Sequence, residues 1–390
     1  ERAIQRLIDR HEALRATFDP GGEGQTVGPP RPAGIAWTDL SGKETGDDDV
    51  ETLLSEELMR PFDLAAGPLI RFHLLRLAEG LHLLAFFFHH LAVDGHSASL
   101  LIDELGILYR AETSGSTAPL PPAASYSRYV EATAERQRRE GSLAEHEAYW
   151  LDRFTPLPPP LALPADHPRP AERTFRGECR NARLDPGLTA RLQELARRLG
   201  CTPSTLFLAA VVALLHRLTG QDDLVVGLPV AGHPPGSGPL VGYLLGLLAL
   251  RFRPRPGDTF ADLAAAARTA TLDAHEHREY PYYRLLRKLG LDGIRDRPPL
   301  IAALFNFDSY AGSRFADLDL ELAKIPTRAA EFEVFWDVLA TGGALDVECC
   351  FNADLFDPAT AERWQRQLRA LLAQVADDPA VTLGELDLDR

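Results

Sequence analysis

The sequence is short of cysteine, of basic residues relative to acidic ones, and of long apolar runs. Only four of its 390 residues are cysteine. The chain has 41 Lys and Arg and 56 Asp and Glu, which gives a formal net charge of -15. The longest apolar runs, such as Leu81 to Phe88 and Leu244 to Leu250, fall far short of the roughly 18 residues of a membrane-spanning helix. Phosphate neutralisation requires clustered Lys and Arg. We therefore expect neither a membrane protein nor a general nucleic-acid binder.

The four cysteines, Cys179, Cys201, Cys349 and Cys350, have no metal-ligand spacing. Cys349 and Cys350 are adjacent in a strand-like segment, where a mutual disulfide would be strained. We expect a protein of the reducing cytoplasm. The first residues read as a helix already under way, without an initiator Met or a signal peptide, as in a piece of a longer protein.

Length and composition predict two folded lobes. A chain of 390 residues exceeds the roughly 250 to 300 residues that one core usually serves. Hydrophobic residues at 45% and charged residues at 25% are typical of globular proteins. Residues 155–177 are rich in proline, which disfavours helix and removes backbone donors. We therefore expect lobes at 1–170 and 171–390.

Apolar periodicity predicts alternating helices and strands, which is an α/β pattern. His11 and His216 fall on apolar helix faces, and we expect hydrogen-bonded core histidines there. Thr202 and Pro203 are typical of a helix start, and the apolar stretch from Leu206 to Leu215 reads as buried core. The expected helices are at about 4–14, 50–60, 97–112, 185–199, 203–218, 259–277 and 358–377, and the strands at about 69–77, 81–89, 223–230, 242–252, 299–308, 331–340 and 344–352.

The segment His89-His90-Leu91-Ala92-Val93-Asp94-Gly95 connects an apolar strand to an amphipathic helix. Such loops often carry chemistry, because rigid elements position them on both sides. Strand alternation places His90 on the face of Phe86 and Phe88 and His89 on the opposite face. We predict that His90 is the reactive imidazole and that His89 braces the loop.

The residue types of this loop suit proton transfer to or from an attacking amine. A neutral histidine with a pKa of about 6.5 is a competent general base near neutral pH, and such positioning contributes about 10² to 10⁴ in rate. Asp94 would organise the loop through a salt bridge or hydrogen bonds. Gly95 lacks a Cβ and so permits close approach of a substrate backbone or thioester arm.

The loop resembles the HHxxxDG signature of the condensation-domain superfamily, which includes chloramphenicol acetyltransferase, dihydrolipoyl transacetylases and the epimerisation domains of peptide synthetases. Five further blocks resemble those of condensation domains of non-ribosomal peptide synthetases, in the family's order. They are Arg10 to Phe18 (RHExLRTxF), Leu163 to Pro170 (LPxDxPRP), Val241 to Arg251 (VGxFVNTLxLR), Glu279 to Tyr283 (QDYPFE) and Pro299 to Asp308 (NPLFQVMFNF).

The resemblance implies two chloramphenicol-acetyltransferase-like lobes, each a mixed sheet flanked by helices, in a V-shaped pseudo-dimer. It implies an acceptor amine attacking a donor acyl thioester, both on phosphopantetheine arms of partner carrier domains, beside adenylation or other synthetase domains. The domain itself is expected to bind no cofactor and no metal. His90, Asp94 and Gly95 are the implied catalytic residues, with His89 in support and Ser97, Tyr243 and Asn306 binding substrate.

Four departures from the family pattern bear on these expectations. Gly246-Leu247 stands where Asn-Thr is usual, and Tyr243 replaces the commoner Phe, a style associated with hybrid peptide-polyketide lines. Gly232-His233 replaces the usual Gly-Arg, which puts in doubt a salt bridge to Asp94. The block that precedes RHExLR, with its first strand, is absent.

Several other functions compete with condensation. An epimerisation domain would carry an EGHGRE-like block, which we do not find. A catalytically silent module that recruits a partner enzyme fits the departures but not the intact His90, Asp94 and Gly95. The Arg10 and Leu163 blocks disfavour an acyltransferase for free coenzyme A thioesters, and cyclisation domains have paired aspartates in this loop. A metal site at the loop and His96 would require further grouped ligands, and the later histidines are scattered.

Overall fold

The computed structural model describes the chain except residues 23, 43–45, 140, 142, 234–235, 311–317, 319, 326, 342 and 390. Its residues divide into two compact units. Unit 1 comprises Glu1–Glu140, Ala231–Leu245 and Gly312–Pro326. Unit 2 comprises Gly141–Val230, Gly246–Ala311 and Thr327–Arg390.

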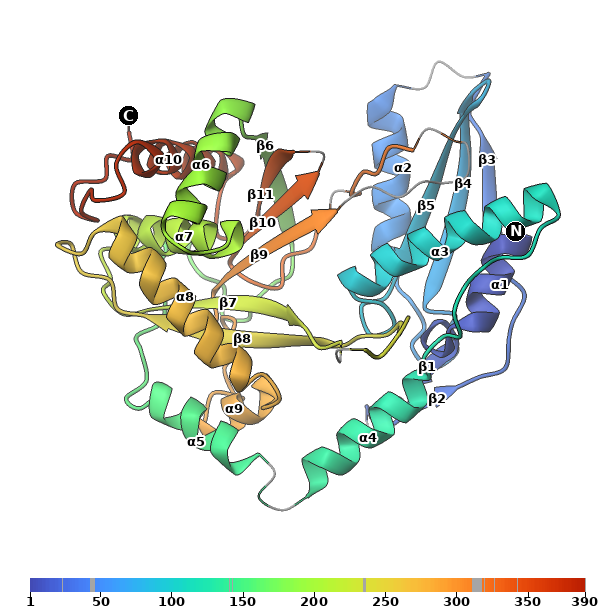
Figure 1. The fold of residues 1–390 in the computed structure, drawn as a ribbon, viewed down its shortest axis with the longest axis horizontal. Coiled ribbons are helices and arrows are strands. Elements are labelled where there is room, and N and C mark those ends of the chain that lie inside the picture. The colour runs from blue at the N-terminus through green and yellow to red at the C-terminus, as the bar shows by residue number, and fades with distance from the viewer. Residues whose placement is uncertain are drawn as a thin grey trace. The chain divides into compact units, whose positions relative to one another are not determined.

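Unit 1 is built on a three-stranded sheet in the order β3 (Ile35–Asp39), β4 (Ile70–Ala78), β5 (Leu81–Phe88), drawn in blue in Figure 1. β3 runs parallel to β4, and β4 and β5 form the antiparallel hairpin that the sequence predicts. A smaller pair joins β1 (Ala16–Phe18) to β2 (Gln25–Val27). The helical elements of the unit are α1 (Arg2–Arg10), η1 (Glu12–Arg15), α2 (Asp47–Met59), α3 (Gly95–Ser114) and α4 (Tyr126–Arg138).

Both faces of this sheet are covered. Phe72 and Phe86 belong to an apolar cluster with α1 and α3, whereas Ala85 and Phe87 pack with Leu54 of α2. Figure 1 shows α2 and α3 on opposite sides of β4 and β5. Alternating side chains of β5 thus enter different cores, as the period of a strand requires.

Unit 2 contains a six-stranded sheet in the order β6 (Gly177–Arg183), β11 (Ala344–Asn352), β10 (Val334–Thr341), β9 (Ala303–Tyr310), β7 (Leu224–Ala231), β8 (Leu245–Phe252). β9 is parallel to β10 and β7, and β11 is antiparallel to β10 and β6. The helices of the unit are α5 (Ala144–Arg153), α6 (Pro186–Arg198), α7 (Pro203–Thr219), α8 (Phe260–Glu276), α9 (Tyr282–Lys288) and α10 (Pro358–Asp377).

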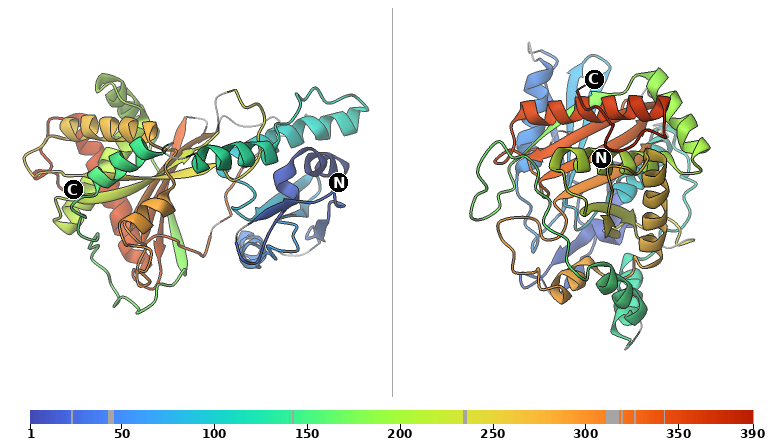
Figure 2. Two further views of the ribbon diagram at one scale, coloured as in Figure 1. Left: turned by 90° about the horizontal axis from the view of Figure 1, so that it is seen from below. Right: turned by 90° about the vertical axis from the view of Figure 1, so that its left-hand side faces the viewer.

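Helix α7 forms the centre of the unit 2 core, beside α8 and α10 (Figure 2). It begins as the sequence predicts, because the Thr202 hydroxyl accepts a hydrogen bond from the Thr205 N–H and Pro203 occupies the first turn. The stretch from Leu206 to Leu215 is buried throughout. No single helix among the described residues is long and apolar enough to cross a membrane; α6 and α7 pass that test only together, across a bend of 101°.

The predicted core histidines are confirmed. The His11 Nε2 lies 2.7 Å from the Glu104 carboxylate, and the His216 Nδ1 donates to the Gln221 carbonyl at 2.7 Å. Both residues are buried.

Three predicted strands begin later than expected. β8 begins at Leu245 instead of 242, because the N–H groups of Gly242 and Leu244 donate to Ser97 of α3 and to Asp94, which precedes α3. β9 begins at Ala303 instead of 299, after Leu300, whose φ of 64° is incompatible with a strand. β10 begins at Val334 instead of 331.

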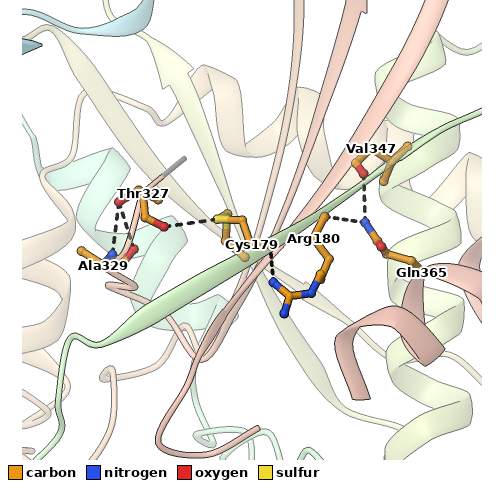
Figure 3. The surroundings of a disulfide bond; sticks show 7 residues. Cys179, Arg180, Thr327, Ala329, Val347 and Gln365 are labelled. Carbon is orange, nitrogen blue, oxygen red and sulfur yellow. Dashed lines mark hydrogen bonds between the residues drawn. A yellow bond between two sulfur atoms is a disulfide. The ribbon is translucent and has the colours of Figure 1, made fainter. Parts of the chain in front are cut away.

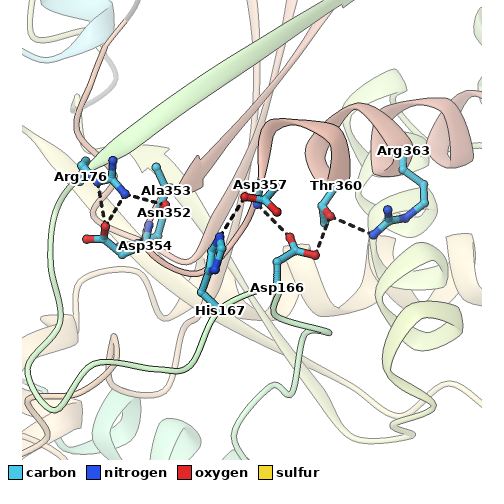
Figure 4. Close-up of polar contacts among 9 residues, drawn as sticks. All are labelled: Asp166, His167, Arg176, Asn352, Ala353, Asp354, Asp357, Thr360 and Arg363. Carbon is cyan, nitrogen blue, oxygen red and sulfur yellow. Dashed lines mark hydrogen bonds and ion pairs between the residues drawn. The ribbon is translucent and has the colours of Figure 1, made fainter.

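The Pro-rich segment packs with unit 2, so the compact units have bounds other than the expected split at residue 170. Its Asp166 carboxylate accepts hydrogen bonds from the Asp357 N–H at 2.8 Å and the Thr360 hydroxyl at 3.0 Å, at the start of α10 (Figure 4). The His167 Nε2 lies 2.9 Å from the Asp357 carboxylate. The LPxDxPRP block thus binds the Pro-rich segment to the start of α10.

Candidate active site

The His-rich loop occupies the turn between β5 and α3 in unit 1. β5 ends at Phe88, and Asp94 is the N-cap residue of α3. The His89 N–H donates to the Leu69 carbonyl at 2.9 Å, and the Ala92 N–H donates to the His89 carbonyl at 2.9 Å. The loop is therefore a tight hydrogen-bonded turn anchored on the end of the hairpin.

His90 is exposed, and one of its ring nitrogens is committed to the loop. Its Nδ1 lies 3.0 Å from the carbonyl oxygen of Val93. A carbonyl can only accept, so Nδ1 carries the proton and Nε2 of the neutral ring keeps its lone pair. The Tyr243 ring lies edge-on to the imidazole, with 5.3 Å between ring centroids and 76° between planes. The site thus presents an oriented nitrogen base beside an aromatic ring.

His89 is half-buried, whereas His90 is exposed. The His89 Nδ1 accepts a hydrogen bond from the Leu91 N–H at 3.2 Å, and the His89 ring lies edge-on to Phe62 with centroids 6.0 Å apart. Burial, with the neighbouring His90, lowers the pKa of His89. These contacts fit the bracing role expected for His89.

Asp94 is fully buried and joins α3 to a distant segment. Its carboxylate accepts hydrogen bonds from the Ser97 N–H at 2.8 Å and from the Leu244 N–H at 3.0 Å. Its own N–H donates to the Gly242 carbonyl at 3.2 Å. The positive end of the α3 dipole also favours a carboxylate at this position. Backbone donors therefore satisfy both carboxylate oxygens.

Ser97 completes this connection. Its hydroxyl donates to the Gly242 carbonyl at 2.9 Å and accepts from the Gly242 N–H at 3.1 Å. The side chain is fully buried. A Cβ on Gly242 would lie 2.3 Å from the Tyr126 ring, so only glycine fits here. The geometry gives the Ser97 hydroxyl an internal, positioning role; direct contact with substrate stays a prediction.

Gly95 is the first residue of α3 and is exposed. A Cβ at this position would meet no heavy atom within 4 Å, and its φ lies outside the left-handed region. The packing of the protein therefore does not require glycine at residue 95. This freedom fits the expectation that glycine here serves the approach of a substrate.

His233 occupies the position where the family pattern has Arg. Its Nε2 lies 3.2 Å from the Leu240 carbonyl, and its ring centroid is 4.2 Å from that of His96. Among the described residues, its buried Nδ1 has no hydrogen-bond partner. Burial lowers the pKa of His233, and the nearby Asp94 charge opposes that shift. The anchoring of Asp94 therefore rests on backbone N–H groups.

The RHExLR block fixes α3 from the side of α1. The Arg10 guanidinium donates to both Glu104 oxygens at 2.8 and 3.1 Å, and His11 contacts the same carboxylate. Burial raises the pKa of Glu104, but the hydrogen bonds from His11 and Arg10 outweigh it and lower the pKa. The Glu12 carboxylate accepts from the Ser127 N–H at 2.8 Å at the start of α4. The block thus acts as a scaffold for the His-rich loop.

Asn306 lies on β9 of unit 2. Its side-chain amide donates to Asp337 at 3.0 Å and to Asp308 at 2.9 Å. A role in substrate binding stays a prediction for this residue.

The structure therefore brings His89, His90, Asp94, Gly95, Ser97 and Tyr243 together in unit 1. Sequence reasoning missed the backbone anchors at Gly242 and Leu244, although it singled out the Val241 to Arg251 block and expected a strand at about 242–252. The available sequence signal for this close backbone contact was Gly242, the glycine next to Tyr243. Chemically, the arrangement offers a proton acceptor at His90 Nε2 on a rigid, exposed turn.

The family model of the condensation domain matches residues 1–389. Chondramide synthase cmdD of Chondromyces crocatus is 32% identical over 400 residues, covering 100% of this chain and 10% of that protein. Phosphinothricin tripeptide synthetase PhsC of Streptomyces viridochromogenes is 34% identical over 401 residues, covering 98% of this chain and 36% of that protein. The chain thus spans only a small part of the curated relatives it matches.

Solved structures agree in fold. The first condensation domain of the calcium-dependent antibiotic synthetase, in complex with substrate analogue 2a, has a TM-score of 0.85 at 25% identity and covers 100% of this chain and 90% of that one. The X-domain from teicoplanin biosynthesis has a TM-score of 0.86 at 23% identity, covers 99% and 88%, and shows the fold alone. These likenesses confirm the predicted α/β fold with sheets flanked by helices. The chain belongs to the condensation domain family of non-ribosomal peptide synthetases.

Proposed function

We propose that this chain catalyses amide-bond formation between a carrier-bound acceptor amine and a carrier-bound donor acyl thioester. One observation carries the proposal: the Val93 carbonyl holds His90 Nδ1 and so orients Nε2 as the basic nitrogen of an exposed ring. The family match over residues 1–389 supports the reaction class.

The residues of the loop take separate roles in this reaction. His90 Nε2 accepts a hydrogen bond, and then the proton, from the acceptor amine as its nitrogen attacks the thioester carbonyl carbon. The new C–N bond forms, the C–S bond breaks, and the proton passes from the imidazolium to the departing thiolate. Asp94 keeps the turn in place, and Gly95 leaves room for the acyl and pantetheine chain beside the reacting carbonyl.

The partners follow from the reaction. The substrates are acyl and aminoacyl groups on the 4'-phosphopantetheine arms of donor and acceptor carrier domains, in a synthetase that also contains adenylation domains; a hybrid polyketide line is one setting. The domain itself would need no cofactor. Tyr243 is proposed to contact substrate beside His90, and Asn306 is also proposed to bind substrate. The cytoplasm stays the expected location.

The test uses donor and acceptor carrier proteins loaded with synthetic aminoacyl-pantetheine. Product on the acceptor carrier is detected by mass spectrometry, with the native protein and His90→Ala compared. We expect product from the native protein and its loss in His90→Ala, whose circular dichroism and melting temperature stay native. No product from any substrate pair, while carriers still bind, would contradict the proposal.

The same assay separates the rival functions. An X-domain structure in complex with OxyB has a TM-score of 0.84 at 24% identity, which is a likeness of fold alone. Recruitment without catalysis would appear as partner binding with no product. Epimerisation would appear as inversion of a carrier-bound residue with no new amide bond.

A further inference from the structure

Cys179 and Cys350 lie directly opposite each other on neighbouring strands of unit 2. β6 is the edge strand of the six-stranded sheet, and the β6–β11 register pairs Cys350 with Cys179. The two sulfurs form a disulfide across a sequence separation of 171 residues (Figure 3). Cys179 is half-buried and Cys350 is buried. The bond therefore ties an accessible sheet edge to the last strand of the unit.

The disulfide lies on the sheet face away from the main core. The neighbouring Val347, Cys349 and Phe351 of β11 point into that core with α7 and α10. Successive side chains of a strand alternate, so Cys350 and Glu348 point to the other face. One sulfur of the bond, on Cys179, thus borders a partly exposed surface.

The two strands are also held together without sulfur. The antiparallel ladder extends from the Asp346–Arg183 pair to the Asn352–Gly177 pair. The Gln365 amide of α10 donates to the Arg180 carbonyl of β6 at 2.6 Å and to the Val347 carbonyl of β11 at 3.0 Å (Figure 3). The bond can therefore open while β6 keeps its place.

The other two cysteines are poor alternatives as partners. Cys349 is adjacent to Cys350 but fully buried in the opposite face, and burial raises the pKa of its thiol. Cys201 follows α6, and burial also raises the pKa of its thiol. Thiol–disulfide exchange requires a thiolate and access. Cys349 is buried and lacks access, whereas Cys201 is half-buried and its raised pKa disfavours the thiolate.

We propose that Cys179 and Cys350 form a reversible thiol–disulfide site whose substrate is a cellular dithiol reductant. Exchange breaks the Cys179–Cys350 bond, oxidises the dithiol to its own disulfide, and moves the two thiol protons of the reductant to the two cysteine sulfurs. The reverse reaction with a disulfide oxidant closes the bond again. The reduced state keeps the fold and loses the covalent tie across unit 2.

The first test counts reactive thiols in the folded protein. The full chain is incubated with dithiothreitol and EDTA without denaturant, then alkylated and mapped by mass spectrometry; EDTA is needed because the two sulfurs and a Glu348 oxygen lie within 4.8 Å of one another and could share a metal ion. We expect the half-buried Cys179 to become labelled while the buried Cys349 stays unlabelled, and oxidised glutathione to restore the bond. Labelling that requires unfolding would show a permanent structural disulfide, and overturn the proposal.

A second test uses variants and needs no knowledge of the native reductant. Cys349→Ser should keep the reversible bond, whereas Cys179→Ser should leave Cys350 free and unable to pair with Cys349 or Cys201. The oxidised native protein should melt several degrees above the reduced protein, because the bond constrains a long loop of the unfolded chain. Cys179→Ser should melt like the reduced protein in both conditions. A new pairing in Cys179→Ser, or equal melting of the oxidised and reduced native protein, would contradict the inference.

Discussion

The Asp94 carboxylate accepts a hydrogen bond at 3.0 Å from the backbone N–H of Leu244, a residue 150 positions later in the chain. The same carboxylate caps α3 through the Ser97 N–H. One buried side chain thus fixes both the start of the helix that follows the His-rich loop and the segment that contains Tyr243. Backbone donors therefore hold Asp94 here, where the family pattern has an Asp–Arg pair.

Removal of this carboxylate should destabilise unit 1 strongly. Asp94→Ala loses an N-cap and leaves the buried Leu244 N–H without an acceptor, a combined cost of about 2 to 4 kcal/mol in the free energy of unfolding. Asp185→Ala is the matched control, because Asp185 caps α6 through Leu188 alone, at 3.0 Å. That variant should lose only about 1 kcal/mol. Urea denaturation checks both values, and equal losses would refute the second role of Asp94.

Gly95→Ala should separate stability from activity. The added Cβ meets no protein atom, and alanine is favoured over glycine in a helix by roughly 0.5 to 1 kcal/mol, so stability should stay equal or rise slightly. If the substrate passes close to residue 95, condensation should fall at least about tenfold, which corresponds to about 1.4 kcal/mol of lost transition-state stabilisation. Gly34→Ala, also free of contacts, is the control and should leave the rate unchanged. Full condensation activity in Gly95→Ala would contradict the proposal that the substrate approaches residue 95.

Tyr243 should matter through its ring. Its side chain is 43% exposed, and its edge contact with His90 is of a type that contributes about 0.5 to 1.5 kcal/mol. Tyr243→Ala should therefore slow condensation by up to about tenfold, whereas Tyr243→Phe, which keeps the ring, should retain most of the rate. Tyr283→Ala removes an exposed ring of unit 2 and serves as control. Similar losses in Tyr243→Phe and Tyr243→Ala would instead point to the hydroxyl.

His233 should make stability depend on pH below neutrality. Burial lowers its pKa in the folded state, so above its unfolded pKa of about 6.5 the ring is neutral in both states and carries no penalty. As the pH falls below that value, the unfolded chain binds the proton first, and the folded state loses stability until the folded pKa is passed. His89, also with a lowered pKa, contributes in the same direction.

His233→Asn should flatten this dependence below about pH 6.5, the unfolded pKa of histidine. The measurement is the difference in free energy of unfolding between about pH 7.5 and 5.5, on either side of that unfolded pKa, with His82→Asn as an exposed control. An unchanged slope in His233→Asn would mean that the buried ring does not titrate on unfolding.

Most of the fold was predictable because apolar periodicity is strong in its main elements. The apolar stretch of α7 and the β4–β5 hairpin match their predictions closely. α5 and β6 were missed, since their patterns are short and largely polar. Missing β6 hid the disulfide, because the register of β6 with β11 is what pairs Cys179 with Cys350. The sequence shows Cys350 next to Cys349 but gives no sign that Cys179 is its partner.

The candidate site was predictable in its side chains but not in its backbone contacts. Strand parity predicts different faces for His89 and His90, and the structure gives the two rings different contacts. Leu244 anchors Asp94 through its backbone N–H. Every residue except proline has such a group, so the residue type at position 244 does not reveal the contact. The same limit applies to Ser97, whose partner is the backbone of Gly242.

The role of His90 is tested most directly by the single-turnover rate of amide formation for the native protein, His90→Ala and the control His82→Ala, which removes an exposed imidazole of β5. We predict a loss of about 10² to 10⁴ in His90→Ala, the usual contribution of a positioned general base, and an unchanged rate in His82→Ala. A His90→Ala rate within about threefold of the native rate, far below that contribution, would contradict the central claim that His90 Nε2 performs the chemistry.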